Sequence, residues 1–103
     1  MAKFALVVVL VNSGFSEDVM NCAREHGVMG GTILHARGSG TKEMEKKYGI
    51  VITPDKEMIM MLVNEEIEEE VLNAIYKEIG LGTMGQGIAF SLPVSDVVGL
   101  KFE

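Results

Sequence analysis

Phe4-Ala5-Leu6-Val7-Val8-Val9-Leu10-Val11 settles most of the architecture. Its residues are all apolar and rich in β-branched valine, which predicts a β-strand. Because side chains alternate between the two faces of a strand, a run without polar residues is apolar on both faces. Met58-Ile59-Met60-Met61-Leu62-Val63 is a second run of the same kind. The chain therefore contains two strands that each need cover on both faces.

Two amphipathic helices are predicted around these strands. Ser16 is the expected N-cap of the first helix, and Gly27 ends it. Asn64 is the expected cap of the second helix, and Gly80 ends it. Apolar residues at helical spacing give each helix one inward face. These are Val19, Cys22, Ala23 and His26 in the first helix, and Ile67, Val71, Leu72, Ala74, Ile75 and Ile79 in the second.

Two shorter strands, at residues 32–37 and 88–92, complete the pattern. The order strand–helix–strand–strand–helix–strand predicts an α+β, ferredoxin-like (βαββαβ) fold with two helices on one face of a four-stranded antiparallel sheet. The first and third strands are central in this topology, and they are the two runs that are apolar on both faces. Pro93 cannot donate a ladder hydrogen bond, which suits an edge position for the fourth strand. Since two helices cover only one face, we expect a homo-oligomer that buries the other.

Glycine-rich segments at residues 30–40 and 80–87 lie next to strand ends. Such backbone passes close to ligands and directs its amides at anions. Gly80, Gly82 and Gly85 have the spacing of the dinucleotide-binding fingerprint, but that motif follows a strand and opens a helix. Here a helix comes first and a strand follows, which excludes an NAD-type site. We interpret the two segments as parts of a small-molecule sensor.

Composition limits the function further. The chain has 103 residues, 48% hydrophobic and 23% charged, as expected for one globular domain over residues 1–103. Its net charge of −6 disfavours nucleic acid and anionic membranes as partners, because phosphate binding needs a basic patch. Cys22 is the only cysteine, and no segment has the length of a membrane span or the pattern of a secretory signal. We therefore expect a cytoplasmic protein with no membrane span.

The glycine-rich segments also carry a resemblance to a known family, the P-II (nitrogen regulatory) signalling superfamily. Gly31-Thr32-Ile33 resembles the start of that family's second strand, and Gly38-Ser39-Gly40 resembles the Gly-x-Gly at the base of its mobile T-loop. Gly85-Gln86-Gly87 is similar to the Gly-Asp-Gly of its B-loop, and residues 96–101 are similar to its C-terminal segment. The resemblance spans essentially the whole chain and indicates a P-II-like member with a short T-loop at residues 38–55.

The resemblance implies a trimer whose three inter-subunit clefts bind adenine nucleotides. Ligand binding sets the T-loop conformation, and the loop then docks on a regulated protein, a transporter or an enzyme. The ligand-binding residues expected here are Thr32, His35, Arg37, Gly38, Gly40, Lys42, Gly85, Gln86, Gly87 and Lys101. The residues expected to present the loop to a partner are Lys46, Lys47 and Tyr48.

Several charged positions of the family pattern are changed in this chain. Ile88 stands where the family has its phosphate-binding lysine, and Gln86 replaces the acid of the B-loop motif. Gly99 and Lys101 stand where the family has two arginines. We therefore expect a regulatory ligand that is an adenine nucleotide or another small anion. Its cradle would consist of the amides of Gly38, Gly40, Gly85 and Gly87, with charge from Arg37, Lys42 and Lys101.

Some of these residues also have a plain structural interpretation. His35 and Arg37 share one face of the second strand, where they either grip an anion or keep an edge strand soluble. Gly85-Gln86-Gly87 either presents amides to a ligand or forms a tight connection that needs positive φ.

Two functions of other classes stay open: a metal-binding trimer like the CutA copper-tolerance proteins, and a structural or assembly protein without a ligand. Cys22 and His26 have the i, i+4 spacing of some metal sites, but no convincing ligand set completes them, so we expect no metal. Met58, Met60 and Met61 are better explained by packing than by a thioether site. Catalysis is not indicated, because no serine is patterned with a histidine and an acid.

Overall fold

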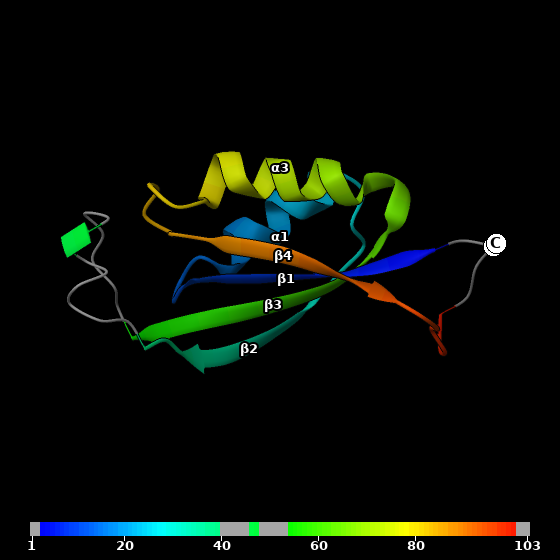
Figure 1. Ribbon diagram of the computed structural model, residues 1–103, viewed down its shortest axis with the longest axis horizontal. Helices are drawn as coiled ribbons and strands as arrows, with labels where there is room; N and C mark the ends of the chain where they lie inside the picture. Colours follow the sequence, from blue (N-terminus) through cyan, green and yellow to red (C-terminus); the bar gives the residue numbers. More distant parts are fainter. Residues whose placement is uncertain (1–2, 40–45, 48–53, 101–103) are drawn as a thin grey trace.

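The computed structural model describes residues 3–39, 46–47 and 54–100. Its strands are β1 (Phe4–Asn12), β2 (Thr32–Arg37), β3 (Asp55–Asn64) and β4 (Ile88–Val94). Its helices are α1 (Ser16–Glu25) and α3 (Glu68–Ile79), and a 3-10 turn, η1 (Glu65–Ile67), leads into α3. Figure 1 shows both helices on the same side of the sheet. Within the described residues, no helix is long and apolar enough to cross a membrane.

The four strands form one antiparallel sheet in the order β2-β3-β1-β4. This order confirms the predicted ferredoxin-like topology. The two runs that are apolar on both faces are the central strands β1 and β3, and β4 with its Pro93 lies at an edge. The register places Val8 opposite Met60 on one side and opposite Phe90 on the other.

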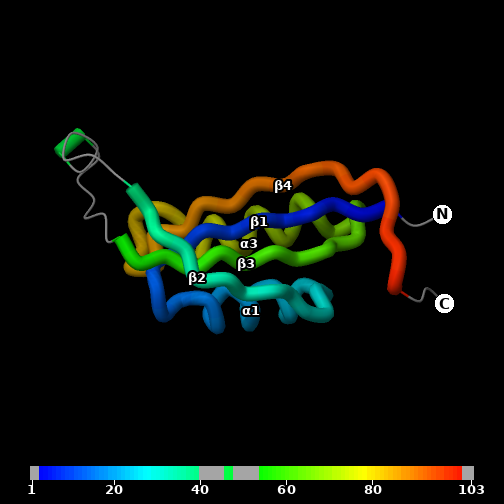
Figure 2. The backbone as a smooth tube through the Cα atoms, turned by 90° about the horizontal axis from the view of Figure 1, so that it is seen from below, coloured from blue at the N-terminus to red at the C-terminus, as the bar shows by residue number. Residues whose placement is uncertain are grey.

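The hydrophobic core lies between the sheet and the helices. Odd-numbered residues of the central strands point into it: Val7, Val9, Val11, Ile59, Met61 and Val63. Alternation then places the even-numbered residues on the opposite face. With their register partners they make this open sheet face almost wholly apolar: Phe4, Leu6, Val8, Leu10, Leu34, Met58, Met60, Leu62, Ile88, Phe90 and Leu92. Figure 2 views the molecule from this side, with the helices behind the sheet.

The structure agrees with some of the predicted helix ends and differs from one of them. Gly27 has φ +97 just after α1, and Asn64 Oδ1 accepts a hydrogen bond of 2.9 Å from the Glu66 N–H, as expected for a cap. The prediction that Ser16 is an N-cap is wrong. Ser16 is the first residue of α1, and its hydroxyl donates to Glu57 Oε2 over 3.1 Å. The hydroxyl therefore bonds a carboxylate distant in sequence and not a backbone N–H of the first helical turn. His26 is half-buried and bonds Glu70 Oε2 at 2.9 Å instead of joining the core.

Both later strands are longer than predicted. β3 begins at Asp55 rather than at Met58, because Arg37 pairs with Asp55 and carries the β2–β3 ladder down to the connection between them. β4 runs two residues past Leu92 to Val94, which lies opposite Phe4. The extension of β3 places Lys56 and Glu57, which the sequence patterns assign to neither loop nor strand, within the sheet.

Candidate functional site

Two segments far apart in the sequence meet at one end of the sheet. The first, here called the loop base, consists of Arg37, Gly38 and residues 54–56. It is closed by a hydrogen bond of 2.7 Å from the Gly38 N–H to the Pro54 carbonyl. The second, here called the glycine loop, is residues 80–87, which join α3 to β4. The end of β1 lies between them.

Asn12, the last residue of β1, contacts both segments. Its backbone N–H donates to the Gly85 carbonyl over 2.9 Å, and its Nδ2 donates to the Met84 carbonyl over 3.0 Å. Its Oδ1 accepts a hydrogen bond of 2.6 Å from Lys56 Nζ. The neighbouring Ser13 N–H donates to the Asp55 carbonyl over 3.1 Å. The expected T-loop root and B-loop are therefore joined within one subunit.

Lys56 is a functional candidate that sequence reasoning missed. Its side chain lies across Gly38, where an added Cβ would be 3.0 Å from Lys56 Cε. No described carboxylate is within ion-pair distance of its ammonium, which donates a hydrogen bond to Asn12 Oδ1. The connecting loop expected from the sequence ends at residue 55 and the expected strand begins at Met58, so Lys56 is assigned to neither element. Its alternation with Met58 and Met60 is the signal that places it on the open side of β3.

The glycine loop is held together by its own hydrogen bonds. The Thr83 N–H and hydroxyl both donate to the Gly80 carbonyl, over 3.1 and 2.7 Å, and the Gln86 N–H donates to the Thr83 carbonyl over 3.1 Å. A Cβ on Gly85 or Gly87 would lie 2.6 Å from an atom of Ile79. Gln86 has φ +47, so the tight connection with positive φ that was considered above is present.

The expected amide cradle is only partly available. The prediction is wrong for two amides, since the N–H groups of Gly38 and Gly87 donate to the carbonyls of Pro54 and Ile79. Close packing of the loop base and glycine loop imposes these bonds. The Gly85 amide donates to no described acceptor, and the residue is buried against Ile79 and Phe15. Gly40 lies outside the described residues.

His35 and Arg37 share a face of β2, as predicted, and that face is on the helix side of the sheet. His35 lies opposite Glu57, and Arg37 lies opposite Asp55. The pKa of Glu57 is lowered, first by the hydrogen bond from the Gly14 N–H and also by Ser16 and by the charge of His35, while burial opposes the shift. The two basic side chains thus face acidic strand partners, which agrees with the edge-strand interpretation.

The other predicted residues are spread more widely. Thr32 is about 16 Å from Arg37 along β2, at a rise of about 3.3 Å per residue, so one subunit does not bring it to the loop base. Lys46 and Lys47 are exposed. Lys42, Tyr48 and Lys101 lie outside the described residues, and their roles stay predictions.

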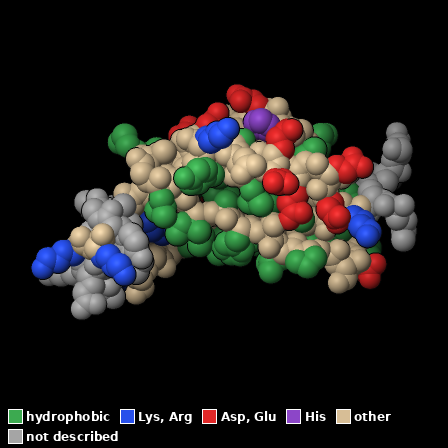
Figure 3. Space-filling model, turned by 45° about the horizontal axis from the view of Figure 1, so that its top comes forward, with side chains coloured by type: hydrophobic (Ala, Val, Ile, Leu, Met, Phe, Trp, Pro, Cys, Tyr) green, Lys and Arg blue, Asp and Glu red, His purple; other side chains and the backbone are tan. Residues whose placement is uncertain are grey.

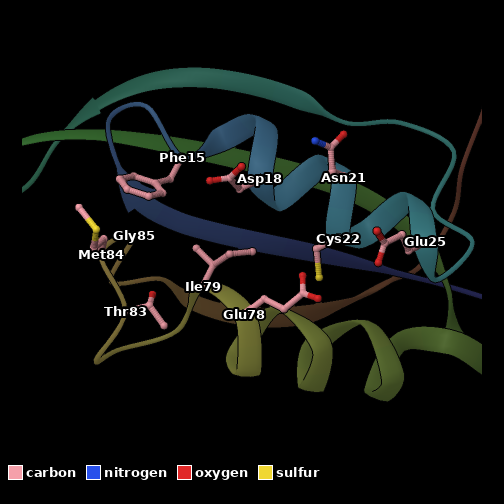
Figure 4. Close-up of a pocket in the computed structure, with 10 residues that line it drawn as sticks. All are labelled: Phe15, Asp18, Asn21, Cys22, Glu25, Glu78, Ile79, Thr83, Met84 and Gly85. Atoms are coloured by element: carbon pink, nitrogen blue, oxygen red, sulfur yellow. The ribbon is translucent and has the colours of Figure 1, made fainter.

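A separate groove lies between α1 and α3 beside the glycine loop (Figure 4). Its volume is about 390 Å³. It is lined by Phe15, Asp18, Asn21, Cys22, Glu25, Glu78, Ile79, Thr83, Met84 and Gly85. Three of these are carboxylates, and Figure 3 shows acidic side chains gathered on the helical side of the molecule. A groove with this charge repels anions, so it is not the expected ligand cleft.

Cys22 lies on the floor of this groove with 2% of its surface exposed. Burial, with a smaller contribution from Glu78, raises the pKa of its thiol to about 12. The thiol is therefore protonated at neutral pH and is a poor metal ligand or nucleophile. No group of three or more histidine, cysteine, aspartate or glutamate residues is placed to hold a metal ion in the described part of the chain.

Comparison with known proteins decides the family. A family model, Nitrogen regulatory protein P-II, matches residues 4–103. The chain belongs to the P-II family. The resemblance drawn from the two glycine-rich segments is confirmed, and proteins of this family are signalling regulators rather than enzymes.

The relatives agree in sequence and fold. The Nitrogen regulatory protein P-II homolog of Arabidopsis thaliana is 28% identical over 106 residues, which cover 97% of this chain and 54% of that protein. The chain thus spans about half the length of this curated relative. The crystal structure of Arabidopsis PII bound to citrate has a TM-score of 0.71 at 27% identity, with coverage of 96% and 84% of the two chains. The B. subtilis GlnK–ATP complex shares the fold, with a TM-score of 0.69 at 18% identity and coverage of 90% and 83%.

Proposed function

We propose that this P-II protein senses a small anionic ligand at the loop base and regulates a partner protein through residues 38–55. The observation that carries the proposal is the position of Lys56. Its ammonium, which has no carboxylate partner among the described residues, lies where Gly38, Asn12 and the glycine loop converge. A charge-assisted contact from a lysine, together with a nearby backbone amide, is a common means of holding an anion.

Two chemical classes of ligand suit this site: an adenine nucleotide and a small carboxylate. Ile88 and Gly99 stand where the family pattern has cationic residues, so the site has less positive charge with which to bind phosphates. B. subtilis GlnK forms a complex with ATP, and Arabidopsis PII has been crystallised with citrate. Lys56 replaces part of the lost charge, and Arg37, Lys42 and Lys101 are candidates for the remainder.

We further propose that the protein is a homotrimer. The open sheet face is apolar across all four strands, and no described element covers it. Its exposed members include Phe90, at 44% of its surface, and Leu92, at 48%. Packing this face against the same face of other subunits removes the apolar surface from water and creates clefts between subunits.

The regulated partner, a transporter or an enzyme, would be contacted by the loop that carries Lys46, Lys47 and Tyr48. Lys46 and Lys47 are exposed, and Figure 3 shows lysine or arginine side chains at the loop end of the molecule. Ligand binding at the loop base would shift the population of loop conformations and so the affinity for the partner.

Isothermal titration calorimetry with ATP, ADP and citrate tests the ligand site. We expect wild type to bind at least one of them, and Lys56→Met to weaken that binding about tenfold or more, as expected for loss of a charge-assisted contact. Lys77→Met on the exposed surface of α3 is the matched control and should bind like wild type. Equal affinity of Lys56→Met and wild type would remove Lys56 from the site. No binding by wild type would favour the structural or assembly role.

A further inference from the structure

We infer that Asn12 is a positioning residue that couples the loop base to the glycine loop. The inference rests on the proposed function and deepens it, since it concerns how the two sides of the same site move together. Among the described contacts, Asn12 is the residue that bonds both segments with one side chain: Oδ1 to Lys56 Nζ at 2.6 Å and Nδ2 to the Met84 carbonyl at 3.0 Å.

The register of the sheet explains why this position has the role. Asn12 of β1 pairs with Lys56 of β3. The ladder between β1 and β4 ends two residues earlier, at the pair Leu10 and Ile88. Beyond that pair, the edge of β1 turned towards β4 has no strand partner. The carbonyls of Met84 and Gly85 take that place and accept the side-chain and backbone N–H groups of Asn12.

The chemistry of the side chain is specific. A carboxamide accepts with its oxygen and donates with its nitrogen, so it can bond an ammonium and a carbonyl at the same time. Aspartate offers only acceptors, and an apolar residue offers neither. Because the Lys56 stem also lies across Gly38, a movement of Lys56 is transmitted to Gly38 on one side and through Asn12 to Met84 on the other.

This arrangement gives the site a relay. An anion that draws the Lys56 ammonium away from Asn12 breaks the hydrogen bond that orients the Asn12 carboxamide. The bond from Asn12 Nδ2 to the Met84 carbonyl of the glycine loop then changes as well. The coupling is reciprocal: a change in the bond between Asn12 and the glycine loop also changes the bond between Asn12 and Lys56. The bond from the Ser13 N–H to the Asp55 carbonyl does not involve the Asn12 side chain, so the end of β1 stays attached to β3 when that side chain is changed.

Hydrogen exchange of the ligand-free protein, followed by mass spectrometry, tests the relay from its two sides. Asn12→Asp keeps the acceptor for Lys56 and removes the donor to Met84. We expect exchange in residues 80–87 to rise about five- to tenfold, as for loss of one hydrogen bond, while the Gly38 amide is unchanged. Lys56→Met should raise exchange at Gly38 more than in the glycine loop, and Asn12→Ala should raise both. Ser13→Ala, at an exposed neighbouring position, is the control and should change neither.

A uniform rise of exchange over the whole chain in Asn12→Asp would show a merely structural role and overturn the inference, as would an unchanged glycine loop. If Asn12→Asp does not fold, the rise of exchange in residues 80–87 of Asn12→Ala beyond that of Lys56→Met reports the bond from Asn12 Nδ2 to the Met84 carbonyl. Because exchange is measured without ligand, its outcome is independent of whether ATP, ADP or citrate binds. Calorimetry on wild type decides the proposed function separately.

Discussion

Glu57→Gln tests how the segment that follows β1 is held against the sheet. Glu57 has 8% of its surface exposed. Its Oε1 accepts a hydrogen bond of 2.6 Å from the Gly14 N–H, and its Oε2 accepts one of 3.1 Å from the Ser16 hydroxyl. Glutamine keeps a single acceptor oxygen and turns an NH₂ group towards one of the two donors. The substitution therefore removes the charge and one of the two bonds.

The expected cost is about 2 kcal/mol of unfolding free energy, since hydrogen bonds to charged groups contribute roughly 1.5–3 kcal/mol. For a chain of this size that is a fall in Tm of roughly 10 °C. Urea unfolding at equal protein concentrations measures it, because the stability of an oligomer depends on concentration. Glu69→Gln, at an exposed position of α3, is the matched control and should change the free energy by less than about 0.5 kcal/mol.

The pH dependence provides a second readout. The pKa of Glu57 is lowered from 4.5 in the folded protein, chiefly by the Gly14 N–H. A folded pKa below the unfolded one means that the stabilisation is fully present above the unfolded pKa. It is lost as pH falls through the folded pKa. The difference between wild type and Glu57→Gln should therefore narrow in acid below pH 4.5. A variant as stable as wild type at neutral pH, or a difference that persists unchanged in acid, would refute the reasoning.

Three further predictions concern other parts of the molecule. Phe90→Glu places a charge on the open sheet face, and light scattering should show a monomer. Tyr76→Glu, at an exposed position of α3, is the control and should keep the wild-type mass. An unchanged mass of Phe90→Glu would contradict packing of subunits through this face. Gly87→Ala places a Cβ 2.6 Å from the Ile79 carbonyl oxygen and should lower the free energy of unfolding by about 1–3 kcal/mol. If urea unfolding gives the wild-type value, the tight packing of the glycine loop is contradicted. Cys22 is buried and the pKa of its thiol is raised to about 12. Mass spectrometry should therefore show that it reacts with iodoacetamide in urea but hardly at all in the folded protein. Equal rates in the two conditions would show that the thiol is accessible.

The elements and their order follow from patterns between near neighbours in the sequence. The apolar runs at residues 4–11 and 58–63 identified the central strands, and Asn64 and Gly27 marked helix ends, because strand formation, capping and positive φ are local preferences. The same glycine-rich segments were enough to indicate the family. Local patterns also indicated an unpaired sheet face, since two helices cannot cover both sides of four strands.

Polar partners were decided only by the tertiary structure. Lys56 and Asn12 are 44 residues apart, and the β1–β3 register alone brings them together. Glu57, 41 residues from Ser16, takes the hydroxyl that local sequence assigned to a helix cap. The Gly87 amide was expected to face a ligand, but the packing of α3 places the Ile79 carbonyl against it. A hydrogen bond goes to whichever complementary group the assembled fold brings within reach, and the spacing of residues along the chain does not specify that group.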